Sequence, residues 1–166
     1  MCSEQRDRAL RVHVQIAEQR LRVLRGDDEI SAYPALTSKH GTGQLRGSYQ
    51  TPLGLHVIRA KIGAGAPLGS VFVGRRPTGE IYSAELAASM PSRDWILTRI
   101  LWLSGLEVGF NRLGPVDTMR RYIYIHGAPQ AEIAAGIGSI GCVRMSNEHV
   151  ADLFERVPVG TTVEIS

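Results

Sequence analysis

Hydrophobic and polar residues alternate in short stretches along most of this chain, and turn-forming residues separate the stretches. Eighteen glycines and eight prolines divide the 166 residues into short segments. Alternation with a period of two is typical of strands that bury one face. The pattern therefore predicts a mainly β protein. We expect a hairpin with arms at residues 12–16 and 21–24, a turn at 77–79, and further strands at 30–36, 55–60, 71–73, 96–103 and 121–126.

One stretch near the carboxyl end follows the helical period instead. Apolar residues recur at helical spacing from Val150 onward, Ser146 can cap the amino end, and Pro158 follows the last apolar position. We predict helices over residues 147–156 and, more briefly, 84–89.

The composition is that of one globular domain, with 43% hydrophobic and 21% charged residues. We expect a flexible amino-terminal segment over residues 1–11 and a single domain over 12–166. The amino terminus, Met1 to Arg11, lacks the apolar stretch of a secretory signal, and no apolar run in the chain is long enough for a membrane span. The net charge is +3, but the basic residues are scattered, which argues against a nucleic-acid partner. Arginine strongly outnumbers lysine, which fits a carboxylate-bearing ligand, although a GC-rich genome explains the bias as easily.

The first candidate for chemistry is a histidine at the end of a predicted strand. Alternation in residues 121–126 places Tyr122, Tyr124 and His126 on one face, while Ile123 and Ile125 face the core. His126 would then stand at the mouth of a cleft. A histidine at a strand end is more often structural than catalytic, so the pattern alone does not decide its role.

The second candidate is a cysteine that follows small residues and precedes the predicted helix. Without a side chain at Gly141, the backbone can approach a substrate carbonyl, and the amides of Gly141 and Cys142 can stabilise an oxyanion. A lone cysteine is usually a small hydrophobic residue, but a thiol needs a base and His126 can supply one. Arg144, two residues on, can hold a substrate carboxylate. Cys2 lies in a polar terminus and is read as an incidental thiol.

These residues together resemble the signature of the YkuD-type L,D-transpeptidase catalytic domain. The likeness covers roughly residues 12–166. It rests on His126-Gly127 followed by Ser139-x-Gly141-Cys142-Val143-Arg144, and it is supported by Thr51-Pro52-Leu53-Gly54, the opening hairpin near Gln19 and the closing segment 160–165. The resemblance implies a mainly β fold, a curved sandwich or barrel with a few short helices, one of them after the cysteine.

The resemblance also implies a two-step acyl transfer through a thioester. Cys142 would be the nucleophile, His126 the general base, and Gly127 the residue whose carbonyl orients that base, while Gly141 with Cys142 would supply the oxyanion amides. Residues expected to contact substrate are Ser139, Tyr122, Tyr124 and Arg144.

The donor implied by the family is a peptidoglycan tetrapeptide stem that loses D-alanine. The acceptor would be an amine on a neighbouring stem, a lipoprotein or a D-amino acid. No metal and no organic cofactor is expected. Such a substrate implies the periplasm or cell envelope, although no export signal is visible. A carbapenem, as a donor mimic, would acylate the thiol.

One position departs from the family pattern, because Ile140 stands where a histidine is usual. Isoleucine donates no hydrogen bond, so substrate choice or turnover can differ. Two alternatives therefore stay open: an L,D-carboxypeptidase that uses water as acceptor, and a catalytically impaired peptidoglycan-binding scaffold. A zinc site built from Cys142, His126 and Asp117 is disfavoured, because the spacing matches no closed structural site.

Overall fold

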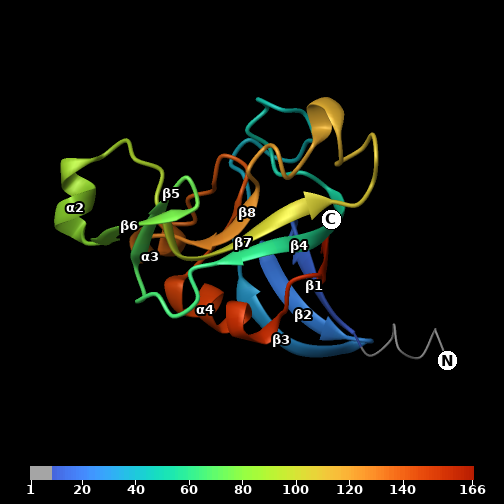
Figure 1. Ribbon diagram of the computed structural model, residues 1–166, viewed down its shortest axis with the longest axis horizontal. Helices are drawn as coiled ribbons and strands as arrows, with labels where there is room; N and C mark the ends of the chain where they lie inside the picture. The colour runs from blue at the N-terminus through green and yellow to red at the C-terminus, as the bar shows by residue number, and fades with distance from the viewer. Residues whose placement is uncertain (1–8) are drawn as a thin grey trace.

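The computed structural model describes residues 9–166, and Figure 1 shows how its strands and short helices are arranged. The elements, in chain order, are β1 (Leu10–Gln15), β2 (Arg20–Arg25), β3 (Asp28–Pro34), β4 (Gly54–Ile62), β5 (Ser70–Val73), β6 (Arg76–Ile81), α2 (Ala84–Ser89), β7 (Ile96–Gly105), the 3₁₀ turn η1 (Gly114–Val116), β8 (Tyr124–Gly127), α3 (Gln130–Ala134), β9 (Val143–Met145), α4 (Asn147–Arg156) and β10 (Thr162–Ile165).

The ten strands of residues 9–166 belong to one open, mixed sheet. Its main path runs β3-β2-β1-β10-β4-β7-β5-β6, and β8 and β9 branch from β7. The pairs β1–β10 and β8–β9 are parallel. After β3 the chain forms an isolated bridge to β9, in which Leu36 and Arg144 exchange two backbone hydrogen bonds of 2.8 Å. This bridge brings the β3 edge back to the β9 edge, so the sheet curls around its core.

The largest core cluster fills the inside of this curl. In β1, alternate residues Val12 and Val14 are buried, as the period-two pattern predicts. From α4, Val150, Leu153 and Phe154 pack into the same cluster. The hydroxyl of Ser146 accepts from the His149 amide at 3.2 Å and caps this helix. The core thus fixes β8, β9 and α4 relative to one another. Among residues 9–166, no helix has the length and apolar character required to cross a membrane.

The sequence predicted most of these elements correctly. The mainly β class, the opening hairpin, and the helices at 84–89 and 147–156 are confirmed. The turn predicted at 77–79 is wrong: β6 runs through these residues, and the hairpin turns earlier, at Gly74 and Arg75, both with positive φ. The first strand begins at Leu10, two residues before the predicted domain start. Residues 1–8 of the predicted flexible segment, which include Cys2, fall outside the described residues.

Candidate active site

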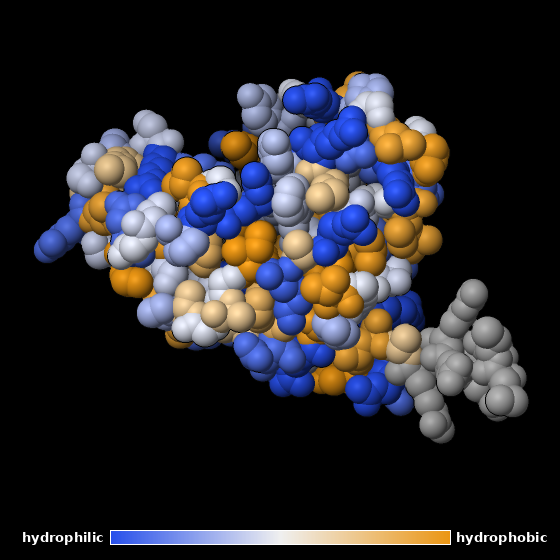
Figure 2. All heavy atoms as spheres, in the orientation of Figure 1, coloured by the Kyte–Doolittle hydropathy of each residue, from blue (hydrophilic) through white to orange (hydrophobic). Residues whose placement is uncertain are grey.

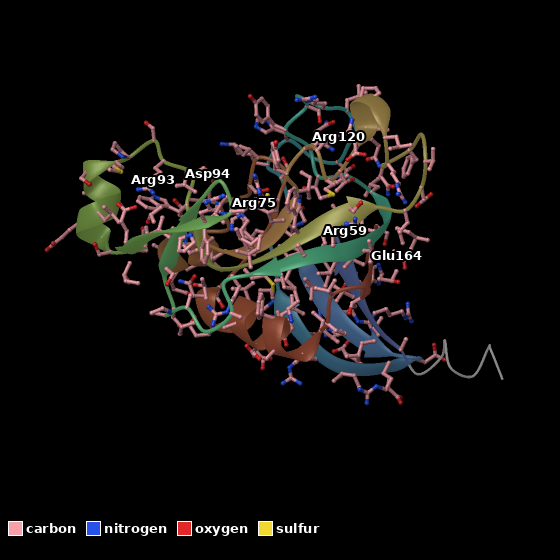
Figure 3. All side chains as sticks on the ribbon, in the orientation of Figure 1. Arg59, Arg75, Arg93, Asp94, Arg120 and Glu164 are labelled. Atoms are coloured by element: carbon pink, nitrogen blue, oxygen red, sulfur yellow. The ribbon has the colours of Figure 1, made fainter. Side chains whose placement is uncertain are left out.

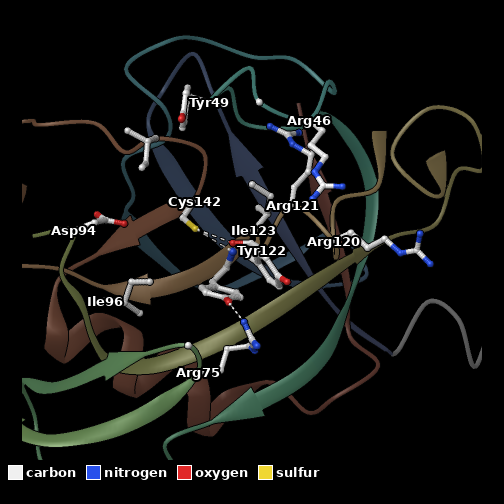
Figure 4. Close-up of a pocket in the computed structure, with 14 residues that line it drawn as sticks. Arg46, Tyr49, Arg75, Asp94, Ile96, Arg120, Arg121, Tyr122, Ile123 and Cys142 are labelled. Atoms are coloured by element: carbon white, nitrogen blue, oxygen red, sulfur yellow. Dashed lines mark hydrogen bonds between the residues drawn. The ribbon is translucent and has the colours of Figure 1, made fainter. Parts of the chain in front are cut away.

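Cys142 is one of the residues that line an open cleft of about 600 Å³. Figure 2 shows the surface indented between the lobe that carries α2 and the loops on the opposite side. Four parts of the chain line the cleft around the cysteine segment, as Figure 4 shows: the loop at 46–49, the β5–β6 turn, the segment before β7, and the turn before β8. The lining side chains include Arg46, Tyr49, Arg75, Asp94, Ile96, Arg120, Arg121, Tyr122, Ile123, Tyr124 and Ile140.

The Cys142 thiol is half-buried and lies directly before β9. Its Sγ accepts the amide of Tyr124 at 3.3 Å, and the thiol donates weakly to the carbonyl of Tyr122 at 3.5 Å. Burial raises the pKa of Cys142 to about 12; the Tyr124 amide opposes this shift, and the charge of Asp94 adds to it. The resting group is therefore a protonated thiol.

His126 lies in β8 and is 1% exposed. Its Nδ1 donates to the Gly127 carbonyl at 2.6 Å, which leaves Nε2 unprotonated in the neutral ring. Burial lowers the pKa of His126, so the imidazole is neutral and can accept a proton. The expectation that it stands at the cleft mouth is wrong, because it is buried and does not line the cleft. Among the hydrogen bonds of residues 9–166, none joins its ring to Cys142.

The strand predicted over residues 121–126 begins later, at Tyr124. Tyr122 lies in the preceding turn with φ +56° and is half-exposed, whereas Tyr124 is buried. The two rings nevertheless gather on Trp102, with centroid separations of 6.1 and 5.9 Å. The residue that joins them is Arg75, whose Nη1 donates to the Tyr124 hydroxyl at 3.1 Å. Sequence reasoning missed Arg75, because no motif connects a hairpin turn with these tyrosines.

Ser139 and Gly141 shape the loop that carries the thiol. The buried Ser139 hydroxyl donates to the Cys142 carbonyl and accepts the Gly141 amide at 3.0 Å. The structure differs here from two expectations: Ser139 is turned into the loop instead of towards substrate, and the Gly141 amide is occupied. Among the hydrogen bonds of residues 9–166, none uses the Cys142 amide, so this amide is the available member of the predicted pair. Gly141 has φ +138°, and a Cβ there would lie 3.1 Å from Ile123, so glycine is required.

Arg144 was expected to hold a substrate carboxylate. In the structure it is buried, and its guanidinium forms an ion pair with Glu132 and donates to the Ile137 carbonyl at 3.0 Å. Its backbone pairs with His126 in the parallel β8–β9 register. The observed arrangement makes Arg144 a support for the segment between α3 and β9.

A strained residue faces the histidine from β7. Thr98 has φ +72°, which is unusual for a β-branched side chain, and it lies in a bulge directly opposite the His126–Gly127 step. Its hydroxyl accepts the Gly69 amide at 3.0 Å and donates to Asn147 Oδ1 at 2.6 Å. A Cβ on Gly127 would lie 2.6 Å from that same Asn147 oxygen. Asn147 and Thr98 thus pack close to Gly127, whose carbonyl orients His126. No sequence pattern indicated this arrangement.

Neither histidine nor carboxylate side chains gather into a metal site within residues 9–166. Asp117, considered as a zinc ligand from the sequence, accepts the amides of Leu113 at 2.7 Å and Arg120 at 2.9 Å in its own loop.

Comparison with known proteins shows which family and which relatives this chain resembles. The family model of the YkuD L,D-transpeptidase catalytic domain matches residues 9–165. A 59-residue stretch is 41% identical to the Bacillus subtilis (strain 168) protein YqjB, and covers 36% of this chain and 32% of that protein.

Solved structures share the fold at low identity. They include an L,D-transpeptidase from Mycobacterium smegmatis, with TM-score 0.55, 18% identity, and coverage of 95% of this chain and 58% of that one. L,D-transpeptidase 3 from Mycobacterium tuberculosis, solved with a faropenem-derived adduct, gives TM-score 0.56, 17% identity, and coverage of 95% and 60%. This chain thus spans about a third of the curated relative and about three fifths of these structures. Because the family model covers nearly the whole chain, the protein belongs to the YkuD family of L,D-transpeptidase catalytic domains.

Proposed function

We propose that this protein is a cysteine L,D-transpeptidase that acts on peptidoglycan tetrapeptide stems. One observation carries the proposal. The thiol of Cys142 lines an open cleft and directly precedes β9, and β9 pairs with β8, the strand that carries His126. His126 is buried and neutral, and the Gly127 carbonyl sets its tautomer. A nucleophile and an oriented base are the two groups that acyl transfer requires.

In the first step Cys142 Sγ attacks the carbonyl between the diamino acid and D-alanine. The thiol proton, which faces the Tyr122 carbonyl at rest, turns to His126 and passes to Nε2 as the S–C bond forms. The C–N bond then breaks, and the leaving D-alanine amine takes the proton from His126. The amide of Cys142 stabilises the oxyanion of the tetrahedral intermediate.

In the second step an amine of the acceptor attacks the thioester. The acceptor proton passes to His126, the S–C bond breaks, and the sulfur recovers that proton, so the enzyme is regenerated. Both steps use only protein side chains, backbone amides and substrate. Because the substrate is a cell-wall polymer, we place the protein in the cell envelope, with stem peptides as its partners.

The test is to incubate the protein with a synthetic tetrapeptide stem and follow it by intact mass. A thioester adduct, stoichiometric D-alanine release and an acceptor-dependent cross-linked product are expected. Cys142→Ala should give none of these, and His126→Ala should slow adduct formation by roughly two or more orders of magnitude. D-alanine release without any acceptor product would identify a carboxypeptidase. No adduct under any condition would overturn the proposal and favour a scaffold.

A further inference from the structure

The cleft around Cys142 carries more positive charge than its own side chains neutralise. Arg46, Arg75 and Arg120 all line it. Among residues 9–166 no carboxylate forms an ion pair with any of the three. Arg121 differs, because its guanidinium donates to the carbonyls of Gly43, Gln44 and Gln50. These hydrogen bonds use the guanidinium to stabilise the loop at residues 43–50. The charge of Arg120 acts on the Asp117 carboxylate in its own loop. The guanidinium groups of Arg46 and Arg75 therefore remain for a ligand.

Arg75 is held in place for such a role. It stands at the tip of the β5–β6 hairpin, with its guanidinium carbon 4.8 Å from the Trp102 ring centroid and 4.9 Å from that of Tyr122. One nitrogen donates to the Tyr124 hydroxyl, and the other donors of the fork are left unused among residues 9–166. Stacking on two rings fixes the plane of the guanidinium, so little side-chain freedom is lost when it binds a carboxylate.

Among the described residues, Asp94 supplies the one carboxylate that lines the cleft, and it stands apart from these arginines. Figure 4 shows Asp94 on one side of Cys142 and Arg46 on the other, while the Arg120 side chain extends away from the thiol. The sequence neighbour of Asp94, Arg93, turns away to Glu80 at 2.9 Å, and no ion pair of Asp94 occurs within the described chain. Asp94 is exposed. The thiol is thus flanked by an acid on one side and the uncompensated guanidinium group of Arg46 on the other.

This charge pattern is complementary to a zwitterionic peptide with an excess of carboxylates. The stem of the proposed function has that chemistry: its D-glutamyl and D-alanyl residues carry carboxylates, and its diamino acid carries an amine. Converting a stem carboxylate to a carboxamide removes the charge but keeps the size. A guanidinium fork binds a carboxylate through two parallel charge-assisted hydrogen bonds, which a carboxamide cannot reproduce.

Resting on the proposed function, we propose that this cleft selects donor stems with free carboxylates over stems with amidated carboxylates. Arg46 and Arg75 are the specificity-determining residues. Asp94 faces the amine of the diamino acid. The selection acts on donor binding, so it appears in KM for acylation more than in kcat.

The experiment compares two synthetic tetrapeptide donors that differ only in free carboxylate or carboxamide groups, with thioester formation as the readout. Wild-type protein should acylate faster with the free-carboxylate donor, by about tenfold in kcat/KM at low salt, and the preference should shrink as ionic strength rises. Arg46→Gln and Arg75→Gln should each reduce use of the free-carboxylate donor by several-fold and use of the amidated donor by much less, so the preference between the two donors shrinks.

A matched control is Arg59→Gln, because Arg59 is exposed on β4 and does not line the cleft; Figure 3 labels it on β4, apart from Arg75. It removes the same charge and should leave the preference intact. Equal acylation by both donors, or equal loss in the control, would overturn the selectivity while the transpeptidase function stands. Absence of a thioester with either donor would instead overturn the proposed function.

Discussion

Alkylation of Cys142 by iodoacetamide distinguishes a resting thiol from a resting thiolate. With its pKa raised to about 12, burial being the main cause, Cys142 has a thiolate fraction on the order of 10⁻⁵ at pH 7. An unperturbed cysteine, with a pKa near 8.5, is about 3% ionised at that pH. Because only the thiolate is alkylated, Cys142 should react about three orders of magnitude more slowly than a cysteine in an unstructured peptide.

The pH dependence gives the sign of the effect. Alkylation of Cys142 should rise about tenfold per pH unit from pH 7 to 10, because the thiolate fraction is far from saturation throughout. Acylation by the stem donor should behave differently, since it uses neutral His126 as a base. The pKa of His126 is lowered by burial, so the base form persists below pH 6.5 and acylation should persist there too.

Peptide-level mass spectrometry after timed exposure measures the alkylation rate at Cys142. Fast alkylation with a plateau below pH 8 would show a thiolate–imidazolium pair at rest, and would refute the reasoning from burial.

Substitutions at three positions probe the groups around the nucleophile. Thr98→Val removes the acceptor of the buried Gly69 amide and should lower the free energy of unfolding by about 1–3 kcal/mol. Thr98→Ser keeps that hydrogen bond and should retain both the stability measured in urea melts and the acylation rate. Equal behaviour of the two variants would show that the hydroxyl has no such role. Ile140→His should change the free energy of unfolding by no more than about 0.5 kcal/mol, because Ile140 is 46% exposed in the cleft. The same variant should change the acylation rate or the product ratio. Identical kinetics would reject a role for this position. Arg144→Ala should lower the free energy of unfolding by about 1–3 kcal/mol, which is less than for a fully buried ion pair because its partner Glu132 is partly solvated. An unchanged urea midpoint would contradict the supporting role of Arg144.

Local patterning was enough to predict the class of the fold and several elements within it. The hairpin of β1 and β2 and the helix α4 follow from alternation, helical spacing and the Ser146 cap, all of which act over a few residues. The strand predicted at 121 failed because Tyr122 adopts φ +56°, and alternation carries no information about a single residue in the left-handed region.

The pairing of Cys142 with His126 came from a motif, but the surroundings of both residues are made by distant segments. Burial of His126, the bulge at Thr98 opposite it, and the contact of Arg75 with Tyr124 all depend on how β5, β7 and β8 associate. Arg144 is a further example. Its spacing from Cys142 predicted that it binds a substrate carboxylate, but in the folded protein it pairs with the carboxylate of Glu132. Pairings of this kind depend on long-range contacts that one sequence does not reveal.

Intact-mass analysis with a carbapenem tests most directly whether Cys142 is an assisted nucleophile. A carbapenem presents a strained carbonyl to the site that the donor would occupy, so His126 can deprotonate the thiol as it attacks. We predict one adduct per chain, mapped to Cys142, absent in Cys142→Ala and formed roughly a hundredfold more slowly in His126→Ala. Adducts distributed equally between Cys2 and Cys142, or an undiminished rate in His126→Ala, would contradict the account.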